Sequence, residues 1–166
     1  DESEIRQIIM SLKNCNSKGH DNLCVNTVKN CSDELAKPLA IIFNQSIIDG
    51  VVPDDLKIAK IVPIYKSDDK KIVSNYRPIS VLPAFSKILE RLIYNRLLDF
   101  INQNDLLSKN QYGFRKNIST SMALIDLVDK ISKSMENSEY TIGIFLDLAK
   151  AFDTVNHNIL LSKLYQ

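Results

Sequence analysis

The chain of 166 residues has few cysteines and no long apolar run. Its cysteines, Cys15, Cys24 and Cys31, are odd in number and show no C-x-x-C spacing, which argues against a zinc site or a disulfide framework. No apolar stretch is long enough to span a bilayer and no signal-peptide pattern is visible, so we do not expect a membrane protein. The net charge of +1 gives no reason by itself to expect an anionic partner.

The distribution of charge is more informative than its sum. Residues 57–116 hold twelve Lys or Arg and five Asp or Glu, an excess of seven positive charges that the flanking segments cancel except for one. A solvated helix face explains such an excess as well as a nucleic-acid surface does, so both interpretations stay open at this point.

Hydrophobic periodicity predicts alternating helices and short strands. Ile5 to Leu12 has helical spacing, and a second helix is expected from an N-cap at Ser32 to Gly50, kinked or delayed by Pro38. Residues 58–65 and 77–81 read as two strands of a hairpin, with Pro63 at an edge or a bulge. Further helices are expected over residues 84–103, 119–137 and from about residue 156.

An apolar run that ends in a carboxylate is the most informative local feature. Residues 142–146 read as a buried strand, and Asp147 follows at its C-terminal end. Burying an unpaired carboxylate is costly, so we expect Asp147 at an opening, in an ion pair or on a metal ion. For an isolated acid at a strand end, a helix cap or a structural ion pair is as good an explanation as catalysis.

Several motifs occur in a fixed order along the chain. They are Ile61-Val62-Pro63-Ile64-Tyr65-Lys66, Ser74-Asn75-Tyr76-Arg77-Pro78-Ile79-Ser80, Phe85-Ser86-Lys87-Ile88-Leu89-Glu90-Arg91, Gln111-Tyr112-Gly113-Phe114-Arg115 and Phe145-Leu146-Asp147-Leu148-Ala149-Lys150-Ala151-Phe152-Asp153. Together they resemble the reverse transcriptase domain of non-LTR (LINE-type) retrotransposons, and more distantly that of group II introns. The resemblance covers roughly residues 16–166.

The resemblance implies an α/β (α+β) fold: the fingers of a right-hand polymerase, rich in helices and carrying a short β-hairpin, followed by the first strand of an incomplete palm. It places fingers and N-terminal palm helices at residues 1–137 and the start of the catalytic palm at 138–166. It further implies an RNA template, a DNA primer, dNTP substrates, and an intracellular protein, nuclear and cytoplasmic. The oligomeric state stays open.

The family's two-metal chemistry assigns roles around the Asp147 motif. Asp147 matches the first catalytic aspartate, a ligand of Mg²⁺, and Leu148 matches the neighbour whose backbone carbonyl also ligates metal. Phe152 matches the bulky residue that excludes a 2′-OH from the incoming nucleotide. Without the family, a core phenylalanine is the simpler interpretation of Phe152.

Four cations complete the expected site. Lys66 and Arg77 match the residues that contact the incoming triphosphate, and guanidinium and ammonium groups suit phosphate oxygens. Arg115 and Lys116 stand where related enzymes meet the template strand. The alternative for Lys66 and Arg77 is a pair of exposed cations at strand ends.

The sequence also departs from the family pattern. No Asp-Asp pair follows Asp147, so the second catalytic signature is missing and we expect this chain to be inactive alone. The segment Lys18-Gly19-His20-Asp21 matches the family's N-terminal motif only in part. The alternative function is a non-catalytic remnant that binds nucleic acid or nucleotide through the surface between Lys66 and Lys116.

Overall fold

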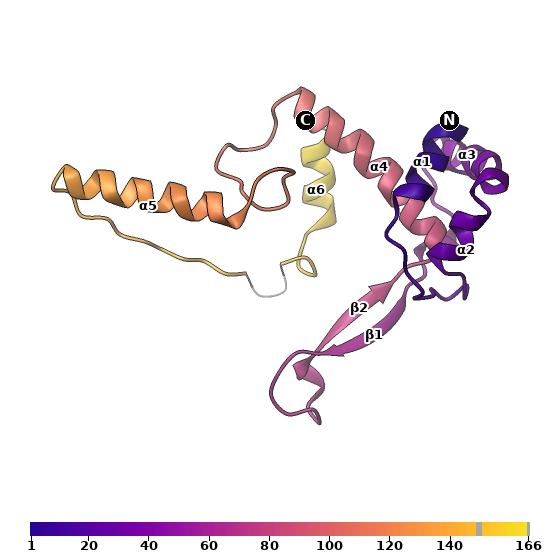
Figure 1. Ribbon diagram of the computed structural model, residues 1–166, viewed down its shortest axis with the longest axis horizontal. Coiled ribbons are helices and arrows are strands. Elements are labelled where there is room, and N and C mark those ends of the chain that lie inside the picture. The colour runs from indigo at the N-terminus through magenta and orange to yellow at the C-terminus, as the bar shows by residue number, and fades with distance from the viewer. Residues whose placement is uncertain (149–150, 166) are drawn as a thin grey trace. The chain divides into compact units, whose positions relative to one another are not determined.

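The computed structural model describes residues 1–148 and 151–165 and separates them into two compact units, residues 1–107 and 108–166. The first unit contains α1 (Glu2–Ser11), α2 (Val25–Asn30), α3 (Ser32–Asp49), η1 (Asp54–Lys57), β1 (Lys60–Tyr65), η2 (Val73–Asn75), β2 (Tyr76–Val81) and α4 (Ala84–Gln103). The second contains α5 (Thr120–Glu136) and α6 (His157–Leu164). The mixture of helices with one antiparallel hairpin confirms the predicted α/β class (Figure 1). The predicted domain boundary at residues 137 and 138 stays a prediction.

The core of the first unit lies where α1, α3 and the first half of α4 pack together. Its buried side chains recur at helical spacing on each helix, as an amphipathic pattern requires. They are Ile5, Ile8, Ile9, Val25, Val28, Ala36, Leu39, Ala40, Phe43, Ala84, Ile88, Leu89 and Leu92. Two ion pairs also cross between helices, Arg6 to Asp33 and Arg96 to Glu4, each at 2.9 Å.

Local signals explain where these helices begin and end. Asp1 accepts a hydrogen bond from the backbone N–H of Glu4 at 2.8 Å and closes a capping box on α1. Gly50 ends α3 in the left-handed conformation at φ 66°, where a side chain would be strained. Ser32 is the first residue of α3 rather than its cap, and Pro38 lies inside the helix without ending it.

The hairpin of β1 and β2 extends from this helical cluster (Figure 1). Apolar side chains on both of its faces are exposed, among them Ile61, Val62, Ile64 and Ile79. A two-stranded hairpin with two open faces is marginally stable in water, so its strands depend on their own pairing and on the order of the loop between them.

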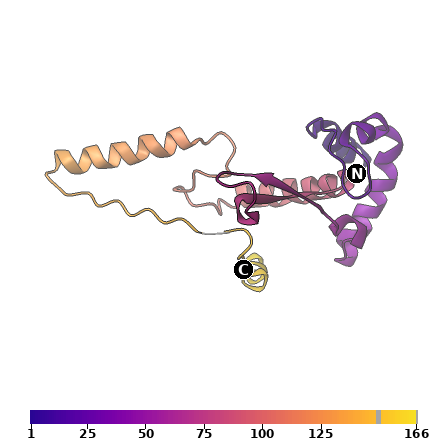
Figure 2. The same ribbon diagram turned by 90° about the horizontal axis from the view of Figure 1, so that it is seen from below.

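In the second unit, α5 and α6 bury no residue among those described. Both helices begin close to the predicted residues: the Ser119 side chain caps α5 by accepting a hydrogen bond from the backbone N–H of Met122, and the Asn156 side chain caps α6 by accepting from those of Asn158 and Ile159. Figure 2 shows residues 139–148, after α5, as an extended coil without helix or strand. No helix among the described residues is both long and apolar enough to cross a membrane.

Candidate functional site

The hairpin register places Lys66 and Arg77 on the same face. Ile64 lies opposite Arg77, and the backbone N–H of Lys66 donates to the carbonyl of Asn75 at 2.8 Å, which continues the ladder by one more pair. Lys66 and Arg77 are therefore diagonal neighbours, and such neighbours lie about 7–8 Å apart in an antiparallel pair. Both side chains are exposed, and neither forms an ion pair with another described residue. Lys66 and Arg77 thus belong to one hairpin, and their contact with a triphosphate stays a prediction.

The loop between the strands is held in place by two tyrosines. Tyr65 and Tyr76 lie opposite each other, with ring centroids 5.7 Å apart in an edge-on arrangement. The hydroxyl of Tyr65 donates to the carbonyl of Asp68 at 2.6 Å, and that of Tyr76 donates to the carbonyl of Lys70 at 2.9 Å. The ammonium of Lys70 lies 5.5 Å from the Tyr65 ring. Lys66 and Arg77 thus stand at the base of an ordered loop, which limits how far their backbones can move apart.

The predicted strand that ends at Asp147 is not formed. Residues 139–148 have no regular secondary structure, and the apolar side chains expected to be buried are 85% exposed at Ile142 and 89% exposed at Leu146. A strand needs a partner for its backbone N–H and C=O groups, and the sheet within the described residues contains β1 and β2 alone. Asp147 is consequently exposed, without an ion pair to any described residue.

The expected magnesium site is not complete in the described part of the chain. A carboxylate at Asp147 and a carbonyl at Leu148 are the hard oxygen donors that Mg²⁺ prefers. However, no group of three or more His, Cys, Asp or Glu side chains gathers among the described residues. A single carboxylate supplies too few ligands, so the residues present do not by themselves fit a two-metal site.

Phe152 contacts the turn that precedes α5. Its ring meets the ring of Phe114 edge to face, with centroids 6.1 Å apart and planes at 89°. Both rings are largely exposed, 80% for Phe152 and 89% for Phe114, so Phe152 is not a core residue in this structure. Its role against the sugar of a nucleotide stays a prediction.

The turn itself holds one of the two cations expected at a template strand. A guanidinium N–H of Arg115 donates to the carbonyl of Ser108 at 3.2 Å, whereas Lys116 is exposed. Phe114 and Asn117 adopt left-handed backbone conformations at φ 61° and 65°, which turns the chain sharply on both sides of these cations. Arg115 therefore has a structural contact besides any contact with nucleic acid.

A hydrogen-bonded triad joins the same turn to α5, and the sequence motifs did not reveal it. The ammonium of Lys130 lies 2.7 Å from the carboxylate of Asp126, which also accepts a hydrogen bond from the hydroxyl of Tyr112. Lys130 and Tyr112 together lower the pKa of Asp126, and the bond to this carboxylate raises the pKa of Tyr112. The Asp126–Lys130 spacing of four residues was the one available signal in the sequence.

The expected site residues therefore fall into two groups, one in each unit. The first is Lys66 with Arg77 on the hairpin, and the second contains Phe152 near the turn that carries Arg115 and Lys116, with Asp147 and Leu148 on the extended segment. Each group is defined within its own unit.

Comparison with known proteins confirms the family that the motifs resemble. Residues 64–166, more than half of the chain, match the family model described as reverse transcriptase (RNA-dependent DNA polymerase). The chain is similar over 96% of its length to the RNA-directed DNA polymerase from mobile element jockey of Drosophila melanogaster, at 38% identity. It is 37% identical over the same share to the probable RNA-directed DNA polymerase from transposon BS, and 31% identical over 98% of its length to that from transposon X-element, both from the same fly.

The chain matches only a small part of each of these relatives. The chain spans 18% of the length of each of the three proteins. Within that span, the family model begins inside β1 and includes the hairpin cations, the turn and the Asp147 segment. These matches show that the chain belongs to the reverse transcriptase family, among relatives from non-LTR retrotransposons.

Proposed function

We propose that this chain supplies the nucleotide-binding hairpin and the first catalytic carboxylate of an RNA-directed DNA polymerase, which extends a DNA primer on an RNA template with dNTPs. The observation that carries the proposal is the shared face of Lys66 and Arg77 on an ordered hairpin, in a chain similar to proteins named RNA-directed DNA polymerases. A planar guanidinium donates hydrogen bonds to two phosphate oxygens at once, and a neighbouring ammonium adds a mobile point charge.

The proposed roles in the second unit concern the reacting end of the nucleotide. Asp147 and the carbonyl of Leu148 contribute ligands to Mg²⁺, the divalent metal proposed for this polymerase, and further carboxylates are needed to complete the site. Phe152 excludes a 2′-OH by its bulk, and Arg115 with Lys116 binds phosphates of the template.

Primer extension with a full-length polymerase that contains this chain tests the proposal. Asp147→Asn keeps the shape of the side chain and removes its charge, so we expect the rate of dNTP addition to fall by about a hundredfold or more, the size of effect seen when a transition-state contact is lost. Glu139→Gln, the same change on the extended segment that precedes Asp147, is the matched control and should leave the rate unchanged. Full activity of Asp147→Asn would exclude the catalytic role.

A second candidate function is binding of nucleotide or nucleic acid without catalysis. The exposed, isolated carboxylate of Asp147 favours it, together with the seven excess positive charges of residues 57–116. For the 166-residue chain alone we expect salt-dependent RNA binding and no DNA synthesis, because no Asp-Asp pair follows Asp147. Robust synthesis by this chain with Mg²⁺ would contradict that expectation.

A further inference from the structure

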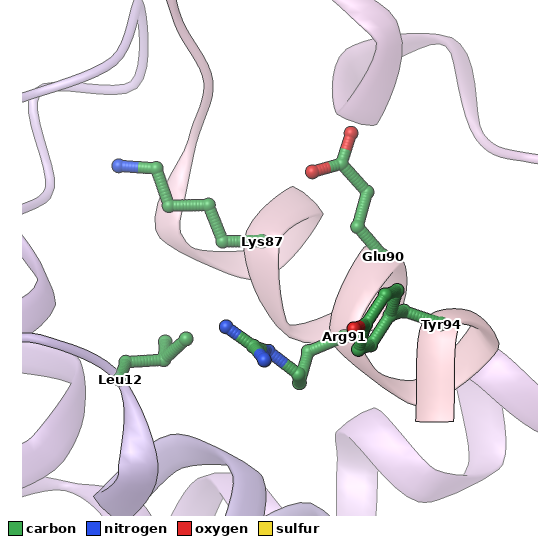
Figure 3. Close-up of a pocket in the computed structure, with 5 residues that line it drawn as sticks. All are labelled: Leu12, Lys87, Glu90, Arg91 and Tyr94. Atoms are coloured by element: carbon green, nitrogen blue, oxygen red, sulfur yellow. The ribbon is translucent and has the colours of Figure 1, made fainter. Parts of the chain in front are cut away.

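A pocket of about 520 Å³ lies in the first unit, between the C-terminal end of α1 and the first half of α4 (Figure 3). None of its side chains belongs to the candidate site described above. The lining residues are Leu12, Lys87, Glu90, Arg91 and Tyr94. The pocket is open to solvent, and its charged lining comes from α4 alone.

Two cations of this pocket stand one turn apart without an acidic partner. Lys87 and Arg91 are four residues apart on α4, and like charges at that spacing destabilise a helix by a few tenths of a kcal/mol. Neither side chain forms an ion pair with any residue that the structure describes. Lys87 is also half-buried, which makes an unpaired ammonium more costly than a fully hydrated one. An anionic ligand would relieve both costs.

A third cation lies at the edge of the same region. Hydrogen bonds from Ser17 are the main cause of the lowered pKa of the Cys15 thiol, and the charges of Lys87 and Lys13 lower it further. Lys13 directly follows Leu12, the residue at the C-terminal end of α1 that lines the pocket. The positive field around the pocket thus extends from α4 onto the segment that follows α1.

The guanidinium of Arg91 is held by an aromatic ring. Its central carbon lies 5.5 Å from the centroid of Tyr94, a cation–π distance. Figure 3 shows the guanidinium directed toward Leu12, while the carboxylate of Glu90 is directed away from it. This contact with Tyr94 uses none of the guanidinium N–H groups as donors and leaves them for a ligand.

We propose that this pocket binds the phosphate backbone of a single nucleic-acid strand, with Lys87 and Arg91 as phosphate contacts and Tyr94 as the residue that positions Arg91. An open site with two cations one helical turn apart suits a chain of phosphodiesters that runs past it, whereas a small ligand is usually enclosed. The proposal rests on the proposed polymerase function, because that function supplies a nucleic-acid strand as the ligand. It adds a contact with the phosphate backbone of that strand on α4, apart from the hairpin and the turn.

Fluorescence anisotropy of a short fluorescein-labelled oligouridylate with the full 166-residue chain tests the site. Arg91→Ala and Lys87→Ala should each weaken binding by about three- to tenfold at low salt and reduce the slope of log affinity against log salt by about 0.7, the contribution of one phosphate contact on a single strand. Lys37→Ala on α3 is the charge-matched control and should leave affinity and slope unchanged. Circular dichroism confirms that each variant keeps its helices.

Two further substitutions separate a phosphate site from a merely basic surface. Tyr94→Phe keeps the ring and should bind like the parent chain, whereas Tyr94→Leu removes the ring and should lose affinity about as Arg91→Ala does. Glu90→Gln removes the one carboxylate of the pocket and should bind as tightly or more tightly. Equal losses in the Lys37, Lys87 and Arg91 variants would show a diffuse electrostatic effect and overturn the proposal.

Competition identifies the source of the phosphate. Inorganic phosphate and dNTP should displace the labelled strand far less well than unlabelled oligouridylate at the same phosphate concentration, and equal displacement would assign the pocket to free phosphate and overturn the proposal. Because Asp147→Asn leaves the pocket intact, oligonucleotide binding should survive in that variant. The proposed polymerase function and the proposed binding of a strand in the pocket can therefore be refuted independently.

Discussion

Pro63 lies directly opposite Pro78 in the β1–β2 hairpin. Neither residue has a backbone N–H, so this pair takes a non-hydrogen-bonded position of the ladder, where N–H groups point away from the partner strand. Hydrogen-bonded and non-hydrogen-bonded pairs alternate along the ladder. The pairs of Ile64 with Arg77 and of Lys66 with Asn75 are therefore hydrogen-bonded. Each free edge of the hairpin also lacks a backbone N–H donor at its centre, which disfavours pairing with another strand.

Restoring those donors should make the hairpin self-associate. In the double variant Pro63→Val and Pro78→Val, each edge gains one outward N–H, and the two exposed apolar faces are already present to support pairing. We expect the apparent mass from sedimentation equilibrium to rise with concentration, whereas the parent chain stays at one mass. Ile79→Val, which adds no donor, is the control. A variant that remains at the parent's mass over the whole range would show that the prolines do not protect these edges.

Removing either hairpin cation should weaken dNTP binding more than chemistry. In a full-length polymerase, Lys66→Ala and Arg77→Ala should each raise the KM for dNTP by about tenfold, the loss expected for one charge-assisted phosphate contact of roughly 1.5–3 kcal/mol that is partly screened by water. Steady-state primer extension at varied dNTP measures this. Arg77→Lys should recover only part of the affinity, because an ammonium cannot bind two oxygens side by side.

Lys60 offers a matched control for that experiment. It lies opposite Val81, on the same face as Lys66 and Arg77 but at the other end of β1. Lys60→Ala should leave the KM unchanged if the base of the loop is the triphosphate site. A similar rise in all three variants would indicate a general effect of charge on the hairpin.

Phe152→Ala should raise incorporation of rNTPs relative to dNTPs in the full-length polymerase, because a methyl group leaves room for the 2′-OH. The ratio of kcat/KM for one matched rNTP and dNTP pair measures the change. Phe114→Ala is the control: it removes the edge-on contact at 6.1 Å and leaves the ring of Phe152 in place. Unchanged sugar discrimination in Phe152→Ala would refute its assignment as the gate.

Elements with their own local signals were predictable from the sequence. The periodic run of residues 84–103 is α4 with the same bounds, and Gly50 ends α3 as its lack of a side chain suggests. The hairpin was predictable because two short, largely apolar runs flank a charged loop. These features depend on residues close to one another in the chain, so no tertiary partner was needed to infer them.

Features that depend on distant partners were not predictable in the same way. The strand before Asp147 has a strong apolar pattern, but a strand forms only against another strand, and the described residues supply none besides β1 and β2, which pair with each other. The short helix α2 was missed because Val25 and Val28 offer one turn of periodicity, and its burial comes from α1 and α3. The pocket on α4 was hidden because its cations were indistinguishable in the sequence from those of a solvated face.

The loop that contains Gly19 should tolerate no side chain at that position. A Cβ there would lie 2.9 Å from the backbone N and Cα of Pro83, the residue that precedes α4, and backbone atoms cannot yield as a flexible side chain does. Gly19→Ala should therefore lower the free energy of unfolding by about 1–3 kcal/mol, the usual cost of overpacking, in a urea titration followed by circular dichroism. Gly113→Ala, where the added Cβ meets open space, should change little. Equal stability of Gly19→Ala and the parent would mean that the loop shifts freely.

The triad of Tyr112, Asp126 and Lys130 should link the turn to α5 over a defined pH window. Asp126 has a lowered pKa, so its contribution is present above the pKa of an unfolded aspartate, about 3.9, and is lost as the pH falls through the lower value in the folded chain. Tyr112 has a raised pKa, so its contribution is present below about pH 10 and is lost as the pH rises through the higher folded value.

Asp126→Asn tests this linkage because it removes the charge that the Tyr112 hydroxyl faces. We expect the pKa of Tyr112 to fall toward that of a free tyrosine, measured from the ring-carbon NMR signal of labelled tyrosine as the pH is raised. Asp129→Asn is the control, because Asp129 pairs with Lys133 at 2.7 Å and leaves the triad intact. If Tyr112 titrates alike in the parent chain and in both variants, its hydroxyl does not bond to Asp126 in solution, and the turn that carries Arg115 and Lys116 is not tied to α5 by this contact.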